Sequence, residues 1–427
     1  MKKSIQASAT SGFNFQVRDG NIFERRGYMP TLNETPRSDR LHIGFFGKRN
    51  AGKSTLINAF TSQQISIVSD VAGTTTDPVF KSMEIAGIGA CVLIDTAGFD
   101  DIGDLGKIRV EKTKKAAERT DIAVILFSDP DIKKELEWFE YFKKKGTPVL
   151  PVISKADTMS DDEISQIASR IKTSTKEDPL VMSAKNESIT EKFKQTLVRL
   201  IPEDFGNRSI TGDLVKEGDL VLLVMPQDIQ APKGRLILPQ VQTIRDLLDK
   251  KCLVMSCTTD KLDETLKALA YPPKLIITDS QVFKTVYDKK PKATMLTSFS
   301  TLFAGYKGDL EYYIKSAEAV ELLTEESKVL IAEACTHAPM AEDIGREKIP
   351  RMLRKKVGEG LTIDIVSGPD FPDDLRGYDL IIQCGACMFN RKYVMSRIER
   401  AKSQGVPMSN YGVILAYLNN ILDKISY

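Results

Sequence analysis

The chain has 427 residues, of which 42% are apolar and 28% are charged, as is usual for folded globular domains. Its 60 basic and 58 acidic residues nearly cancel, which removes the electrostatic argument for binding nucleic acid. No apolar stretch reaches the ~18 residues that a membrane span needs, and the first residues lack the apolar core of a secretory signal. We therefore expect a cytoplasmic protein that binds neither membrane nor nucleic acid, and we expect its six cysteines to serve metal, redox or core roles rather than disulfides.

After a polar N-terminal extension over residues 1–40, short apolar strands alternate with amphipathic helices. This alternation predicts an α/β fold in three domains, over residues 41–205, 206–291 and 292–427. In the first domain, strands expected at 41–46, 90–94, 122–127, 148–153 and 180–182 predict a doubly wound, mostly parallel sheet. In the third domain, strands expected at 329–334 and 379–382 each run directly into a cysteine motif.

A glycine-rich turn joins the first strand to the first helix and fits the pattern G-x-x-x-x-G-K-[ST]. Backbone N–H groups of such a loop wrap phosphates at the positive end of a helix. Lys53 would reach the β- and γ-phosphates, and Ser54 would bind Mg²⁺. The predicted phosphate site consists of Gly47, Asn50, Ala51, Gly52, Lys53, Ser54 and Thr55.

Later motifs indicate which nucleotide is bound. Asp95 to Gly98 (D-T-A-G) follow an apolar strand, so that Asp95 can hold the Mg²⁺ shell and the Gly98 N–H can contact the γ-phosphate. Thr75 lies between this motif and the phosphate loop, where a second hydroxyl could bind Mg²⁺. We expect Lys53, Thr75 and Gly98 to act in catalysis.

Two further motifs follow the next strands and favour guanine. In Ser154-Lys155-Ala156-Asp157, the carboxylate can accept from guanine N1–H and N2–H₂, which adenine cannot offer. Backbone groups of Ser183, Ala184 and Lys185 could support the base.

Three of the cysteines come after the ends of predicted strands in the third domain. Cys384 and Cys387 form a C-x-x-C, and Cys335 and His337 follow another strand. Because ligand sites form at the carboxyl ends of parallel strands, the two groups can converge. A redox dithiol, a zinc site completed by His337, and an iron–sulfur cluster with one labile iron all fit this set. Glu342 or Asp343 could supply a weak oxygen ligand, and His337 could instead be a structural histidine.

The first domain resembles the translation-factor-like GTPases, and within them the branch that contains the tRNA-modifying GTPase MnmE. Asn50 and the run Gly73-Thr74-Thr75 carry this resemblance. It implies that Asn50 helps to bind a K⁺ ion, in addition to the Mg²⁺ ion bound by the residues named above. Ser154 stands where that class has Asn, and Phe99 stands where Ras-like proteins carry a water-orienting Gln, which predicts slow intrinsic hydrolysis.

The whole chain resembles the HydF family of [FeFe]-hydrogenase maturation GTPases, from residues 32–37 to residues 384–391. The family motif C-x-H … H-C-x-x-C is matched by Cys335, His337, Cys384 and Cys387, whereas Gln383 replaces the second His. The resemblance implies GTPase, dimerisation and cluster-binding domains, and a homodimer with a [4Fe-4S] cluster on the three cysteines. It also implies that the chain carries a diiron precursor from two radical-SAM maturases to apo [FeFe]-hydrogenase.

Two other functions fit the residues. One is a tRNA- or ribosome-associated GTPase with a structural zinc domain, although the near-neutral charge disfavours it. The other is a structural dimer with a vestigial GTPase, which the intact Lys53, Ser54, Thr75, Asp95 and Asp157 disfavour.

Overall fold

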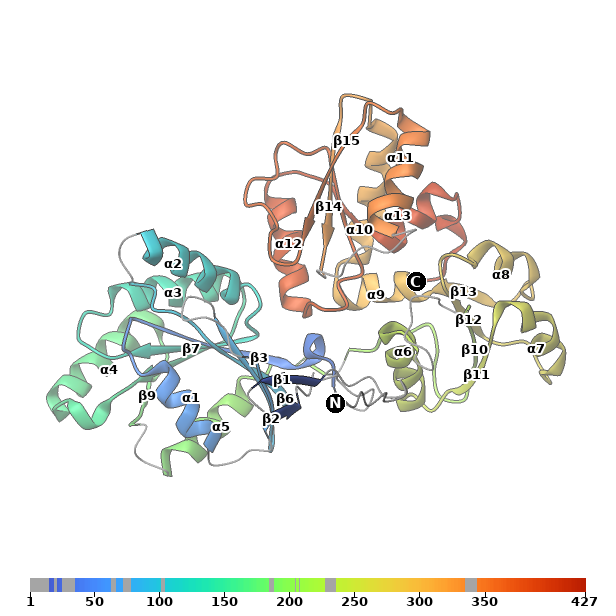
Figure 1. Ribbon diagram of the computed structural model, residues 1–427. Coiled ribbons are helices and arrows are strands. Elements are labelled where there is room, and N and C mark those ends of the chain that lie inside the picture. The colour runs from blue at the N-terminus through green and yellow to red at the C-terminus, as the bar shows by residue number, and fades with distance from the viewer. Residues whose placement is uncertain are drawn as a thin grey trace, which may run out of the picture. The chain divides into compact units, whose positions relative to one another are not determined.

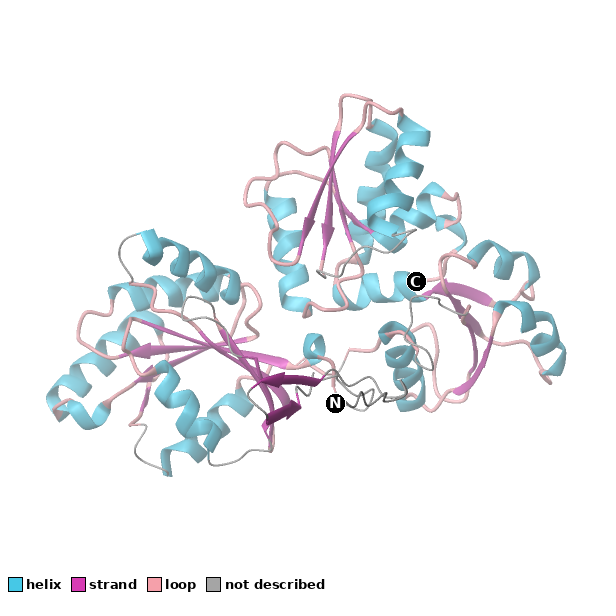
Figure 2. Cartoon of the chain, in the orientation of Figure 1, coloured by secondary structure: helices cyan, strands magenta, loops and turns pink. Residues whose placement is uncertain are grey.

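The computed structural model describes residues 15–18, 21–24, 35–62, 67–71, 78–100, 104–183, 188–203, 205–206, 208–226, 236–334 and 344–427. Residues 1–36 form a unit of their own, in which strands β1 (Phe15–Arg18) and β2 (Asn21–Glu24) pair antiparallel. The rest of the chain forms a second unit with three separate sheets, each flanked by helices (Figures 1 and 2). Within the described residues, no helix combines the length and apolar character that crossing a membrane requires.

The first sheet has seven strands in the order β4-β5-β6-β3-β7-β8-β9. Five of them run parallel: β3 (Leu41–Gly47), β6 (Gly89–Asp95), β7 (Ile122–Phe127), β8 (Val149–Ile153) and β9 (Leu180–Val181). The expected mostly parallel α/β sheet is confirmed. The structure adds an antiparallel edge made of β4 (Ile67–Val71) and β5 (Val79–Ile85), which the sequence analysis did not predict.

The described residues of this domain form five α-helices: α1 (Lys53–Ser62), α2 (Asp104–Ala117), α3 (Lys133–Lys144), α4 (Asp161–Thr175) and α5 (Ser188–Arg199). Buried strand side chains divide between two cores, because successive residues of a strand point to opposite faces of the sheet. Leu41, Ile43 and Phe45 pack in one core and Phe46 in the other. Every residue of β3 is buried, which holds the loop that follows it in place.

The second sheet contains β10 (Leu220–Val224), β11 (Leu253–Cys257), β12 (Leu275–Thr278) and β13 (Met295–Ser298), all parallel, in the order β11-β10-β12-β13. Its helices are α6 (Leu238–Asp249), α7 (Leu262–Ala268), α8 (Phe283–Lys289) and α9 (Phe299–Lys307). Because β13 pairs with β12, the domain boundary predicted at residue 291 falls before the last strand of this sheet.

The third sheet is also parallel, in the order β15-β14-β16-β17. Its strands are β14 (Lys328–Glu333), β15 (Thr362–Ser367), β16 (Leu380–Gln383) and β17 (Met408–Asn410), and its helices are α10 (Leu310–Ala317), α11 (Ile349–Val357), α12 (Arg391–Ser403) and α13 (Tyr411–Leu418). The strand order reverses between β14 and β16, and crevices at the carboxyl ends of strands open at such a reversal. Both cysteine motifs follow these two strands.

Candidate functional site

The phosphate loop runs from the end of β3 to the start of α1 and has a left-handed backbone at two positions. Asn50 has φ = 59° and Gly52 has φ = 87°. Glycine adopts this region freely, and asparagine is among the few other residues that visit it readily. The Ala51 N–H donates to the Lys48 carbonyl at 3.2 Å, which closes the turn. The loop thus has the compact shape that lets backbone N–H groups converge on phosphates.

Lys53 lies inside this loop. Its side chain is buried, with the residue 7% exposed, and its Nζ donates to the carbonyls of Gly47 at 3.0 Å and Lys48 at 2.8 Å. These carbonyls hold the ammonium group where a phosphate chain wrapped by the loop would pass. Ser54 and Thr55 open α1 and are exposed beside it.

Asp95 ends β6 next to Ser54 and is suited to Mg²⁺. The Ser54 hydroxyl donates to Asp95 Oδ2 at 2.5 Å, while the buried Oδ1 has no hydrogen-bond partner among the described residues. Burial raises the pKa of Asp95, and the Ser54 hydrogen bond and the charge of Lys53 oppose this shift. A buried carboxylate oxygen without a partner, beside a hydroxyl, is the hard oxygen chemistry that Mg²⁺ prefers.

Gly98 packs directly on the backbone of the phosphate loop. A Cβ at this position would lie 2.5 Å from the Arg49 nitrogen, so only glycine fits. The Arg49 N–H donates to Asp100 Oδ1 at 2.6 Å, which ties the loop after β6 to the phosphate loop. Phe99 is 6% exposed and stacks on Trp138 with ring centroids 5.7 Å apart, so its ring is directed into the core. Thr75 lies outside the described residues.

The base-binding motif is tied to the phosphate loop by Ser154. This residue is buried, and its hydroxyl donates to the Ala51 carbonyl at 2.8 Å, so it tethers the motif although the usual amide is missing. Asp157 is exposed and accepts a hydrogen bond from the Ser183 hydroxyl at 2.9 Å. The stem of Lys155 lies over Gly52, 3.9 Å from where a Cβ would stand. Ala184 and Lys185 lie outside the described residues.

The cysteine loop begins where β16 ends, between β14 and β17. The Cys384 Sγ accepts hydrogen bonds from the backbone N–H of Ala334, at 3.0 Å, and of Ala386, at 3.4 Å. Ala334 ends the described segment before Cys335, so the two cysteine motifs start from adjacent strands. Cys384 and Cys387 are half-buried. Two N–H donors on one sulfur favour a thiolate, which is the form that binds metal.

The remaining predicted ligands Cys335, His337 and Glu342 lie outside the described residues. Within the described ranges, no three His, Cys, Asp or Glu side chains gather into a metal site. Gln383, at the end of β16, is fully buried, and neither atom of its amide has a partner in the described part of the chain.

Residues that follow Cys387 contact the first domain. Asn390 Nδ2 donates to the Arg119 carbonyl at 2.7 Å and to Asp121 Oδ2 at 3.3 Å. The Arg119 guanidinium lies 4.4 Å from the ring centroid of Tyr393 and 5.3 Å from that of Phe389. Arg119 comes just after α2, the helix that follows the Asp95–Gly98 motif, so this contact joins the two predicted sites through one helix.

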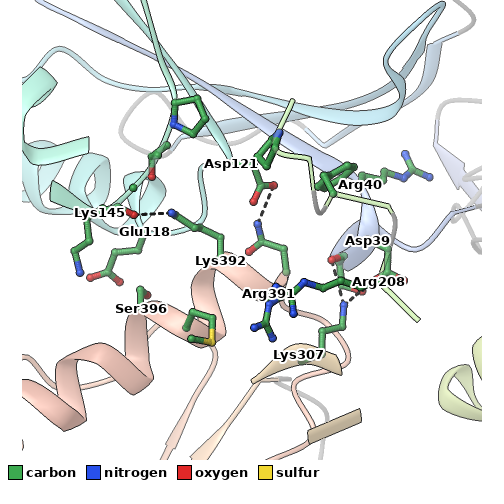
Figure 3. Close-up of a pocket in the computed structure, with 18 of the residues that line it drawn as sticks. Asp39, Arg40, Glu118, Asp121, Lys145, Arg208, Lys307, Arg391, Lys392 and Ser396 are labelled. Atoms are coloured by element: carbon green, nitrogen blue, oxygen red, sulfur yellow. Dashed lines mark hydrogen bonds and ion pairs between the residues drawn. The ribbon is translucent and has the colours of Figure 1, made fainter. Parts of the chain in front are cut away.

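A cavity of about 360 Å³ lies beside this contact, away from the phosphate loop. Figure 3 shows Lys392 directed at the backbone of Lys145, where its Nζ donates to the carbonyl at 2.8 Å. Lys307 and Asp39 form an ion pair on the same wall. No local motif in the sequence marks this cavity, because its lining residues come from distant parts of the chain.

A phosphate loop, a magnesium carboxylate and a guanine-type motif on a mostly parallel sheet define a P-loop GTPase domain, here followed by two further α/β domains. Comparison with known families agrees: residues 42–155 match the 50S ribosome-binding GTPase family. Residues 210–308 match the Hydrogen maturase F dimerization domain, and residues 311–426 match the Hydrogen maturase F tetramerization domain. The chain belongs to the hydrogen maturase F, or HydF, family.

Curated relatives match the GTPase part. The tRNA modification GTPase MnmE of Flavobacterium johnsoniae is 32% identical over 166 residues, 37% of this chain and 35% of that protein. GTPase Der of Wolinella succinogenes is 34% identical over 198 residues, 43% of this chain and 40% of that protein. The chain thus spans less than half the length of either relative. The solved structure of Aquifex aeolicus Era bound to GDP and AlF₄⁻ is 19% identical to this chain. Its TM-score is 0.32, and the match covers 54% of this chain and 98% of Era.

Proposed function

We propose that this chain is a GTP-hydrolysing iron–sulfur carrier in the maturation of [FeFe]-hydrogenase. It would hydrolyse GTP to GDP and phosphate, bind a [4Fe-4S] cluster, and pass a diiron precursor from two radical-SAM maturases to apo-hydrogenase. The observation that carries the proposal is that one chain combines a GTPase domain with two domains of the HydF family. In the last of these domains, the sulfur of Cys384 accepts hydrogen bonds from two backbone N–H groups.

In GTP hydrolysis, the phosphate loop binds and orients the triphosphate. Lys53 would neutralise charge on the β- and γ-phosphates, and Ser54 and Asp95 would hold Mg²⁺, which would supply positive charge to the phosphates. The close packing of Gly98 on the loop supports a contact between its N–H and the γ-phosphate. Because Phe99 is buried against Trp138 and cannot orient water, we propose that K⁺ held by Asn50 raises the rate.

In the cluster domain, Cys335, Cys384 and Cys387 would bind the cluster. The hydrogen bonds to Cys384 support this role, since N–H donors stabilise metal-bound sulfur. An amide is a poor ligand for iron, so Gln383 is not the fourth ligand, which leaves His337, Glu342 or solvent.

The contact between Arg119 and the residues after Cys387 supports coupling between the two sites. Nucleotide exchange moves the segments that contact the γ-phosphate in GTPases. Here α2 leads from that segment to Arg119, which packs on Phe389 and Tyr393. If this contact transmits the change, Arg119→Ala should make the EPR spectrum of the cluster insensitive to a non-hydrolysable GTP analogue.

We propose a homodimer through β11, the edge strand of the second sheet. Leu253 and Met255 on this strand are 51% and 38% exposed, which is unusual for an apolar edge that is left uncovered. A second copy can extend the sheet by pairing with this strand. Leu253→Asp should shift the protein to monomers in light scattering, whereas Tyr271→Asp, an exposed apolar control in the same domain, should not.

The first experiment measures iron, acid-labile sulfide and the reduced-state EPR spectrum of the anaerobically reconstituted protein. About four irons and four sulfides per chain are expected for a cubane cluster. Cys384→Ser should lose the cluster and keep GTP hydrolysis, and Cys257→Ser, which removes another half-buried cysteine, should keep both. Zinc without sulfide would refute the carrier function.

A further inference from the structure

A guanidinium group is buried near the cysteine loop and has no acidic partner among the described residues. Arg397, on α12, is 1% exposed, and burial lowers its pKa. Its Nη2 donates to the Gly368 carbonyl at 2.6 Å and to the Tyr393 hydroxyl at 3.4 Å. Its Nε and Nη1 have no hydrogen-bond partner in the described part of the chain, and no carboxylate there pairs with it.

Aromatic rings surround this guanidinium. Its central carbon lies 4.7 Å from the ring centroids of Phe371 and Phe389 and 4.8 Å from that of Tyr393. Cation–π contacts offset only part of the penalty for removing a charge from water. A buried cation therefore calls for an anion nearby.

Cys384 is the group that can supply this anion. Against its burial, Tyr393 and then Cys384 act to raise the pKa of Arg397, whereas Arg119 acts in the opposite direction. A tyrosine hydroxyl and an ordinary thiol are both mostly neutral near pH 7, but a cysteine that binds metal is a thiolate, so Cys384 supplies negative charge once it ligates the centre. Because Phe389 follows Cys387 by two residues, the aromatic enclosure is continuous with the cysteine loop.

Two more buried polar groups near Cys384 have no partner among the described residues. The Tyr313 hydroxyl is one, and the charge of Cys384 acts on this tyrosine as well. The Gln383 amide, directly before Cys384, is the other. Buried polar atoms are almost always hydrogen-bonded. Together with Arg397, these unpartnered donors in the described part of the cluster domain indicate a ligand that carries negative charge and accepts hydrogen bonds.

We propose that Arg397 is the counter-cation of a negatively charged iron–sulfur centre on the Cys384 loop and raises the reduction potential of that centre. The inference rests on the proposed function. Arg397 would act on the centre through its positive charge and would not itself bind iron. Nearby charge and hydrogen bonds to sulfur set the potentials of such centres. Loss of one positive charge that is buried next to the cysteine loop should lower the ratio of reduced to oxidised centre about tenfold at a fixed potential, which is about 59 mV for one electron.

The test is a redox titration of the full-length reconstituted protein, followed by EPR. Arg397→Gln removes the charge and keeps a donor for the Gly368 carbonyl, while Arg397→Lys keeps the charge. Arg400→Gln is the matched control, since Arg400 lies one turn further along α12 and pairs with Glu118 and Asp373. Thermal unfolding of the cluster-free proteins reports on folding, and Arg397→Met replaces the Gln variant if the latter does not fold.

A potential that falls about 59 mV in the neutral variant, and stays near the wild-type value in Arg397→Lys and Arg400→Gln, would support the proposal. A neutral variant that folds and titrates like the wild type would overturn it and leave the carrier function intact. Neutral variants that unfold even without cluster would also overturn it, because Arg397 would then serve the fold. A wild-type protein without iron and sulfide would overturn both.

Discussion

A buried histidine and a buried aspartate in the GTPase domain should have opposite effects on stability as the pH changes. His42, on β3, donates its backbone N–H to Asp121 Oδ2 at 2.9 Å, and its ring Nδ1 lies 3.7 Å from the same oxygen. Burial raises the pKa of Asp121 from 3.8 to about 7 and lowers the pKa of His42 from 6.5 to about 4. Both side chains are therefore neutral in the folded protein between these two values.

The sign of each contribution follows from the direction of its shift. A raised pKa means that Asp121 contributes stability at low pH, which is lost as the pH rises through about 7. Each pKa unit is worth about 1.4 kcal/mol, so this contribution is at most about 4 kcal/mol. A lowered pKa means that His42 contributes stability above pH 6.5, which is lost as the pH falls through about 4 and amounts to about 3 kcal/mol. Between these limits the two contributions largely cancel.

Asp121→Asn should therefore gain stability relative to the wild type as the pH rises from 4 to 7, by about 1.4 kcal/mol per unit. His42→Gln should show the mirror image and gain as the pH falls. Asparagine can still accept the His42 N–H, so the comparison isolates the charge. Urea unfolding can be followed by Trp138, the single tryptophan of the chain, which stacks on Phe46 in the same domain. A difference between variant and wild type that does not change with pH, or has the same sign for both variants, would refute the reasoning.

Three further changes test the nucleotide site. Lys53→Ala should reduce GTP hydrolysis at least about 100-fold without unfolding the domain. Unchanged turnover in the pure variant would show that this loop does not bind the phosphates of GTP. Replacing K⁺ by Na⁺ should slow hydrolysis in the wild type but not in Asn50→Gly, which keeps the left-handed backbone; equal wild-type rates in both salts would reject the cation role. Asp100→Ala removes the acceptor of the Arg49 N–H, which then becomes available to a phosphate. Calorimetry should show that a GTP analogue binds this variant about fivefold more tightly and that GDP binding is unchanged. A loss of affinity for both nucleotides would show that Asp100 instead maintains the shape of the loop.

The predicted strands of the parallel sheets match the structure closely, because buried parallel strands are continuous apolar runs. The misses have local causes. Helix α4 was expected only as one of the helices between the strands and was given no bounds, although Ser160 and Glu163 form a capping box at its start, a signal visible in the sequence. Strand β5 was not predicted because charged residues interrupt its apolar run and only three of its seven residues are buried. Strand β13 was not predicted, and the boundary placed at residue 291 assigned its residues to the third domain, whereas they pair with β12 of the second sheet.

The sequence by itself determined the chemistry that depends on neighbouring residues. A phosphate loop needs its glycines, lysine and serine at fixed spacing along one turn, and a C-x-x-C needs only a short loop after a strand, so both can be recognised without a fold. The tertiary structure alone decided how such motifs are supported. Ser154 tethers Ala51 although 103 positions separate them, and Arg397, from a different element of the fold, lies buried against Phe389 of the cysteine loop. These relations follow from strand order and helix packing, which bring distant residues together and remove them from water, and no local spacing encodes that burial.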